Sequence, residues 1–237
     1  AKDAQDALKA TPTSVSNTNF SASPKNELAA ISNQLHQHLI HNRGAEALKT
    51  IEDAIFKQHA ADTLYRNVIN KVMRKLVKEN QGQKVQLHLP TLHNHLERVL
   101  ERLWSFFSGR IPSKGLVVMG RPTGESGSLK MLVTFLRAAG FSVMDLGSRV
   151  TPSHFVQTVT STNADLLCIM LRTEVGIQNA AYVRQLLNHQ GLGNVPMLVG
   201  GPLLNRHPEH VQRTGASACA TDALDLVQKT YYLTQTR

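Results

Sequence analysis

Apolar residues recur at spacings of three and four along residues 27–107, which is the period of an amphipathic helix. Gly44 and the polar stretch 80–82 interrupt this pattern and divide it into shorter segments. The pattern predicts four amphipathic helices, whose first apolar residues are Leu28, Ala47, Leu64 and Leu92. Four such helices joined by short connections predict a helical bundle.

From Lys114 onward the period changes to short apolar runs that alternate with turns and helical stretches. The runs expected to form strands are residues 115–119, 142–146, 165–170, 195–199 and 216–220. Helices are expected over residues 129–139, from Thr151 onward, and over 180–187, 208–214 and 223–233. Strands that alternate with helices of this length predict an α/β domain with a doubly wound, five-stranded parallel sheet.

The first 26 residues are rich in Ser, Thr, Asn and Pro and poor in large apolar side chains. Such a segment cannot bury enough surface to offset the entropy lost on ordering, so we expect a flexible linker or tail over residues 1–26. The bundle is then expected over 27–110 and the α/β domain over 114–237. A chain that opens on a linker is expected to continue a longer protein.

Hydrophobic residues make up 41% of the chain, which is enough for a core. No apolar run approaches the roughly 20 residues of a membrane span, and the start of the chain has no secretory signal. We therefore expect a soluble, cytoplasmic protein, with Cys168 and Cys219 as reduced core thiols. The net charge of +9 favours an anionic partner such as nucleic acid or a phosphate-bearing ligand, although a solvated helix face explains the basic stretch 66–84 equally well.

Ligands of open parallel sheets bind beyond the carboxyl ends of the strands, where this sequence has glycine-bearing turns. Glycine there either lets a ligand approach the backbone or only permits a tight turn. The first turn has neither a dinucleotide fingerprint nor a phosphate loop, and no catalytic constellation stands out, so we expect no enzyme. The predicted ligand-binding residues of this edge are Gly120, Thr123, Gly124, Glu125, Ser126, Gly127, Leu146, Gly147, Thr151, Ile169, Leu171, Thr173, Gly200, Gly201 and Thr221.

A helical bundle that leads into a doubly wound domain resembles the cobalamin-binding module of corrinoid methyltransferases and of light- or redox-responsive regulators. The Leu64–Tyr65 pair followed by Val68, the Asp145–Gly147 segment and the Gly200–Gly201 pair carry the resemblance, which covers about residues 27–233. The resemblance implies cobalamin as the cofactor. Haem, or no cofactor at all, are the alternatives.

The chain departs from this family at the cobalt ligand. The family's loop reads Asp-x-His-x-x-Gly, and its histidine coordinates the lower face of cobalt. Anchored on Gly127, this chain has Pro122 in place of the aspartate and Gly124 in place of the histidine, and Ile169 replaces a small hydroxyl residue of the third strand. We therefore expect no cobalamin held by a histidine of this loop.

Other histidines are candidates for a substitute metal ligand, because a neutral imidazole binds cobalt or haem iron. Each of them could equally be a surface or capping residue. The candidates are His93 and His95, which are also expected to contact the cofactor, and His154.

The leading hypothesis is a regulatory sensor that resembles cobalamin-type photoreceptor and antirepressor modules. A tetrapyrrole between the bundle and the sheet edge would control transcription through a DNA-binding transcription factor or an upstream DNA-binding domain. The hypothesis allows a homo-oligomer. Two alternatives stay open: a corrinoid carrier of a methyltransferase system, and a cofactor-free interaction module that has kept the fold.

Overall fold

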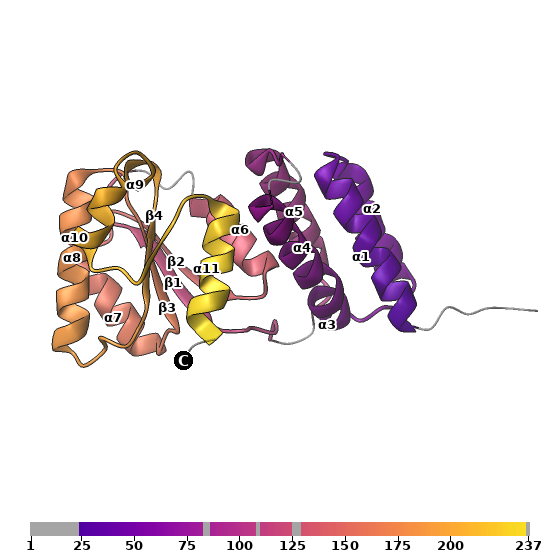
Figure 1. Ribbon diagram of the computed structural model, residues 1–237. Helices are drawn as coiled ribbons and strands as arrows, with labels where there is room; N and C mark the ends of the chain where they lie inside the picture. Colours follow the sequence, from indigo (N-terminus) through magenta and orange to yellow (C-terminus); the bar gives the residue numbers. More distant parts are fainter. Residues whose placement is uncertain (1–23, 83–85, 108–109, 125–128, 236–237) are drawn as a thin grey trace, which may run out of the picture.

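The first part of the chain is a bundle of helices (Figure 1), as the hydrophobic pattern predicts. The computed structural model describes residues 24–82, 86–107, 110–124 and 129–235. The helices of the bundle are α1 (Pro24–Ile40), α2 (Gly44–Phe56), α3 (Ala61–Leu64), η1 (Tyr65–Ile69), α4 (Asn70–Gln81) and α5 (Leu89–Trp104). Because α3, the π-helical turn η1 and α4 follow one another without a break, they form the third of the four predicted helices. None of the described helices has both the length and the apolar character that a membrane span requires.

The second part is the predicted five-stranded α/β domain. Its strands are β1 (Leu116–Arg121), β2 (Ser142–Ser148), β3 (Leu166–Met170), β4 (Met197–Gly200) and β5 (Ala218–Ala220). Its helices are α6 (Leu129–Ala138), α7 (Pro152–Thr162), α8 (Glu174–His189), α9 (Pro202–Arg206), the short 3-10 turn η2 (Pro208–His210), α10 (Val211–Thr214) and α11 (Ala223–Gln235). The strands are parallel in the order β2-β1-β3-β4-β5, which is a doubly wound order.

The apolar runs are continuous because helices cover both faces of the central strands. Successive side chains of a strand point to opposite faces. Along β3, Cys168 and Met170 therefore belong to the core beneath α6 and α11, whereas Leu167 and Ile169 belong to the core beneath α7 and α8. The first of these cores continues into the helical bundle.

Two helices of this domain differ from the prediction. Helix α8 begins at Glu174, six residues earlier than expected, because the Thr173 hydroxyl accepts a hydrogen bond from the amide of Gly176 (3.2 Å) and caps the helix. Helix α9 was not predicted. It follows Gly201, whose φ of +125° suits glycine, and it has Pro202 at its first position.

The bundle lies beside the α/β domain, against α6 and α11 (Figure 1), and not over the ends of the strands as the sensor hypothesis assumed. The Tyr65 hydroxyl donates to the carbonyl of Arg137 (2.6 Å), and the Asn70 amide donates to that of Ala138 (3.2 Å). Both contacts fix the bundle to the C-terminal end of α6. Only the end of α4 and the start of α5 come near the carboxyl edge of the sheet, within the described ranges.

Candidate functional site

A cavity of about 240 Å³ opens at the carboxyl edge of the sheet, between α6 and α11. Its position is where ligands of open parallel sheets bind. A larger hollow of about 460 Å³ lies on the outer surface of the bundle between α1 and α2, away from the strand ends. The residues that line the edge cavity are Leu89, Arg121, Met131, Leu132, Met170, Gly201, Pro202, Asn205, Ala220, Thr221, Asp222, Ala223 and Leu226.

The walls of this cavity are mostly apolar. Helix α6 contributes Met131 and Leu132, and α11 contributes Ala223 and Leu226. Met170, the last residue of β3, lies between these helices because its side chain points to their side of the sheet. A cavity with such walls suits the apolar part of a small ligand.

Arg121 is the exception among the buried lining residues. It ends β1, and its side chain is 2% exposed. Burial and then the nearby positive charge of Arg172 lower its pKa. A guanidinium offers five N–H donors in a planar fork, so a ligand that enters this cavity meets a strong hydrogen-bond donor for an acceptor or an anionic group.

The rim of the cavity is polar and touches the bundle. One carboxylate oxygen of Asp222 accepts from the amides of Leu224 (2.8 Å) and Asp225 (2.9 Å) and so caps α11. Its other oxygen lies 3.5 Å from the side-chain amide of Asn80, at the end of α4. On the opposite side, the Asn205 side chain donates to the carbonyl of Thr221 (2.7 Å), which ties α9 to the end of β5.

The structure brings only some of the predicted edge residues to this cavity. Gly201 and Thr221 line it directly. Thr123 and Thr173 do not line it, but their hydroxyls meet at 2.8 Å beside the turn after β1. Thr151 caps α7 by accepting from the amide of His154 (3.3 Å). The remaining residues of the first turn, Glu125, Ser126 and Gly127, lie outside the described part of the chain.

Gly201 is required by the backbone itself. Its φ lies in the region that favours glycine, and a Cβ at this position would come within 2.2 Å of the carbonyl oxygen of Leu171. The tight passage from β4 to α9, which shapes one wall of the cavity, therefore depends on this residue.

Several predicted ligand residues have a packing role instead. Ile169 and Leu171 are fully buried in the core beneath α7 and α8, on the other face of the sheet from the cavity, so the expectation for them does not match the structure. A Cβ on Gly120 would meet the ring of Phe155 at 2.8 Å and Leu146 at 3.2 Å. A Cβ on Gly200 would lie 3.0 Å from the carbonyl oxygen of Ala220. Gly147 has φ +72° and an open surrounding, as a turn residue does.

The three candidate axial histidines do not line the cavity. His93 lies four residues after Leu89, on the same face of α5, and its Nε2 is 3.8 Å from a carboxylate oxygen of Glu97. His95 packs against Gly44 at the start of α2, inside the bundle, and burial followed by the charge of Arg98 lowers its pKa. His154 is exposed in the first turn of α7. A metal-ligating role for these residues remains a prediction.

The residues present fit one part of the implied cofactor and not another. The apolar cavity at the sheet edge can hold a flat apolar group. Gly124, in the position of the family's lower histidine, has φ +83° and offers no side-chain donor to a metal. Its nearest described neighbours are Arg121 and Arg172, whose Cδ atoms lie 3.9 and 4.0 Å from an added Cβ. Neither of these cations replaces an imidazole.

The sequence argument missed the residues that line the cavity from the helices and from the last position of β3. Arg121 had the clearest signal, because a charged residue ends an otherwise apolar run. Met170 could be placed only once the register of β3 was known, since a shift by one residue exchanges the two faces. Asp222 has the position of a helix cap, because it directly precedes α11.

Comparison with known proteins places this domain. Residues 117–227 match the family model of the B12 binding domain. The dimethylamine corrinoid protein of Methanosarcina barkeri is 30% identical over 118 residues, and dimethylamine corrinoid protein 3 of Methanosarcina acetivorans is 29% identical over the same length. Each match covers 48% of this chain and 54% of the relative, so the chain spans about half the length of these curated relatives.

Solved structures share the fold over a longer stretch. A cobalamin-binding protein from Desulfitobacterium hafniense DCB-2 has a TM-score of 0.67 at 19% identity, over 85% of this chain and 97% of its own. The methanol:cobalamin methyltransferase complex MtaBC from Methanosarcina barkeri has a TM-score of 0.69 at 17% identity, over 92% of this chain and 86% of the matched chain. At these identities the likeness concerns the fold, and it includes the helical bundle.

These comparisons correct the leading hypothesis. The matched relatives are named as corrinoid proteins, so the prediction of a transcriptional sensor or photoreceptor with a DNA-binding partner is wrong. They favour the alternative of a corrinoid carrier, and they agree with cobalamin as the cofactor expected from the sequence. The fold and the edge cavity agree with the family match, and residues 117–227 of this chain are similar to the B12 binding domains.

Proposed function

We propose that this chain binds cobalamin at the carboxyl edge of the sheet and serves as the corrinoid carrier of a methyltransferase system. The observation that carries the proposal is the apolar cavity between α6 and α11, at the ligand edge of a domain that matches the B12 binding family. Cobalamin supplies a cobalt centre that can accept and give up a methyl group. The chain itself holds and presents the cofactor and is not the enzyme.

The residues of the cavity suggest how the chain would hold the ligand. Met131, Leu132 and Leu226 would enclose an apolar group and exclude water from it. Arg121 would donate to an acceptor of the ligand from inside the cavity, where hydrogen bonds to a charged group are strong. Because Gly124 provides no imidazole, we expect cobalamin to bind without a histidine ligand from the turn after β1.

Binding is tested by absorption spectroscopy. The full chain is incubated with hydroxocobalamin and desalted, and one equivalent of cobalamin should remain bound. Asn205→Trp places a large ring at the exposed rim of the cavity and should abolish retention. Gln178→Trp makes the same change on the exposed side of α8 and should not affect it. A featureless spectrum of the wild type after desalting would refute the proposal.

The carrier role needs a separate test. Chain loaded with cobalamin that bears a radiolabelled methyl group is mixed with a thiol acceptor, with and without a corrinoid methyltransferase. We expect the label to move to the thiol only when the methyltransferase is present. Retention of the label under both conditions would overturn the carrier role and leave cobalamin binding intact.

A further inference from the structure

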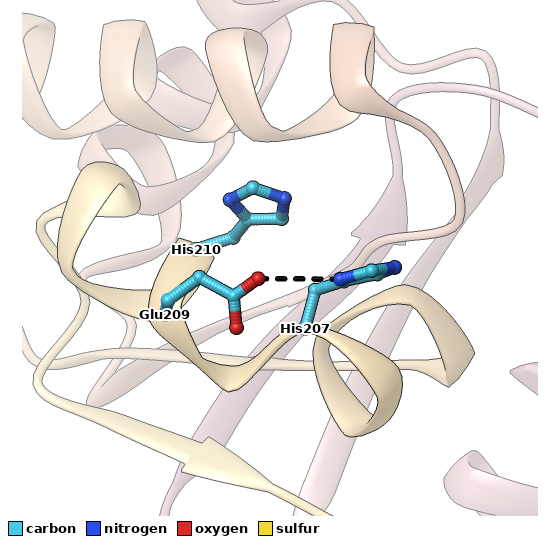
Figure 2. Close-up of side chains that lie close together, drawn as sticks. All are labelled: His207, Glu209 and His210. Atoms are coloured by element: carbon cyan, nitrogen blue, oxygen red, sulfur yellow. Dashed lines mark hydrogen bonds and ion pairs between the residues drawn. The ribbon is translucent and has the colours of Figure 1, made fainter.

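Three potential metal ligands lie together on the turn between α9 and α10, outside the cavity. His207, Glu209 and His210 each offer one ligand atom, and these atoms all lie within 4.8 Å of one another. Figure 2 shows the imidazoles of His207 and His210 close to the Glu209 carboxylate, with His207 Nδ1 3.2 Å from a Glu209 oxygen. Within the described residues, no other group of three His, Cys, Asp or Glu side chains meets in this way.

The backbone of this turn holds the ligands in place. The amide of His207 donates to the carbonyl of Leu203 (2.9 Å), and the amide of His210 donates to the carbonyl of His207 (3.1 Å). Two residues separated by three positions in such a turn lie on one side of it. The two rings accordingly lie close together, with centroids 5.5 Å apart and planes tilted by 37°.

A second carboxylate borders the cluster. An oxygen of Glu174, in the first turn of α8, is 3.9 Å from His210 Nε2. Two carboxylates, those of Glu174 and Glu209, therefore meet at this spot with one arginine, Arg213, on a chain whose net charge is +9. A divalent cation gains from such a spot by Coulomb attraction.

We propose that His207, Glu209 and His210 bind one divalent transition-metal ion, with Zn²⁺ as the best match. Two imidazole nitrogens and a carboxylate oxygen are a ligand set that suits zinc, and three protein ligands leave a position for water. Zinc would draw its ligand atoms closer together than they lie now, to about 2 Å from the ion. The side chains can make this movement because those of His207 and Glu209 are 51% and 64% exposed.

Arg213 is the competitor of the metal at this site. Its guanidinium donates to His210 Nδ1 (3.0 Å) and pairs with Glu174. It therefore takes up ligand capacity and adds a positive charge beside the proposed ion. Replacing it with an uncharged residue should strengthen metal binding, whereas loss of either histidine should weaken it.

The test is Zn²⁺ titration by calorimetry of the full, cobalamin-free chain, together with the absorption bands of Co²⁺ as a probe of nitrogen ligation. We expect one equivalent of Zn²⁺ in the wild type, at least a tenfold loss of affinity in His207→Ala and His210→Ala, and a gain in Arg213→Met. His41→Ala, at an exposed histidine directly after α1 whose ring lies 2.8 Å from the carbonyl of Gln37, is the matched control and should not change this site.

The chain has eleven histidines, so binding alone is not enough. The double variant His207→Ala/His210→Ala decides the assignment. If it loses the one-equivalent site, the assignment holds. If it binds Zn²⁺ as the wild type does, or if neither the wild type nor Arg213→Met binds Zn²⁺, the proposal is refuted and the cluster is an ordinary histidine–glutamate pair.

Discussion

The two ends of α6 have different surroundings, polar at the C-terminal end and apolar at the N-terminal end. At its C-terminal end, four polar side chains from different elements, which we call the carbonyl clamp, bind the last carbonyls of the helix. Tyr65 donates to the carbonyl of Arg137, and Asn70 donates to the carbonyl of Ala138. The carbonyl of Ala139 accepts from both Tyr231 (2.6 Å) and Lys114. Towards its N-terminal end, α6 instead offers Met131 and Leu132 to a cavity.

The comparison teaches where this molecule holds its shape and where it can bind a ligand. Carbonyls at the end of a helix need partners, and the carbonyl clamp supplies them from the bundle, from α11 and from the segment before β1. The carbonyls at this end are therefore already bonded to side chains of the protein. The cavity end has apolar walls and one buried cation, Arg121, so a ligand can contact both an apolar surface and a hydrogen-bond donor there. Changes at the clamp should therefore alter stability, and changes at the cavity should alter binding.

The largest effect is expected from Gly140→Ala, at the clamp. Gly140 has φ +102°, and an added Cβ would lie 2.5 Å from Asn70 Oδ1 and 2.7 Å from Lys114 Nζ. Backbone strain and this clash together should cost about 3 kcal/mol or more of the free energy of unfolding. Chemical denaturation measures the loss.

Gly147→Ala is the matched control at the cavity end of the sheet. Its φ of +72° is also unfavourable for alanine, but no atom lies within 4 Å of an added Cβ. Only the strain of about 1–2 kcal/mol should remain. Equal losses in the two variants would show that the clamp is not tightly packed.

The two ends also differ in how far the sequence could predict them. The four bundle helices and the five strands follow from hydrophobic period alone, because burial of an amphipathic face dictates both. The Leu64–Tyr65 pair was noticed as a family feature, but its bond to Arg137 joins residues 72 positions apart and has no local signal. The glycine turns located the ligand edge. The walls of the cavity depend on helix rotation and strand register, which is why Ile169 was expected there and Met170 is found.

The next largest effect is expected on the affinity for cobalamin, from a change at Arg121. Arg121→Met keeps an unbranched stem, in a shorter side chain, and removes the N–H donors of the guanidinium. If Arg121 donates to cobalamin, affinity should fall by a factor of about ten to a hundred, the equivalent of one hydrogen bond to a charged group. Equilibrium titration of cobalamin measures the change, with Arg98→Met, on an exposed position of α5, as the control. An unchanged affinity would remove Arg121 from the site.

A smaller effect is expected from Tyr65→Phe. The variant keeps the ring, which packs edge-on against Phe107 at 6.0 Å, and loses the bond to the carbonyl of Arg137. We expect about 1 kcal/mol less stability, or a fall of roughly 2–4 °C in Tm, with cobalamin affinity unchanged. Tyr182→Phe, at an exposed position of α8, should have no effect. A loss of affinity in Tyr65→Phe would show that the clamp and the cavity are coupled.

The last prediction uses pH to isolate the clamp hydroxyl. Burial, and then the neighbouring Tyr231, raise the pKa of Tyr65 to about 12, against about 10 for an unfolded tyrosine. The folded chain therefore keeps this proton where the unfolded chain releases it, so the stability from Tyr65 is complete below pH 10 and is lost between pH 10 and 12. Tyr65→Phe has no such proton. The difference in the free energy of unfolding between the wild type and Tyr65→Phe should therefore become smaller above pH 10, as measured by urea denaturation at a series of pH values. Burial also raises the pKa of Tyr231. Because an ionised Tyr231 disfavours ionisation of Tyr65, the difference between the two proteins reports Tyr65 together with this coupling. A gap that stays constant from pH 8 to pH 11 would mean that the Tyr65 hydroxyl is already open to water, and the clamp would then be no tighter than the cavity end.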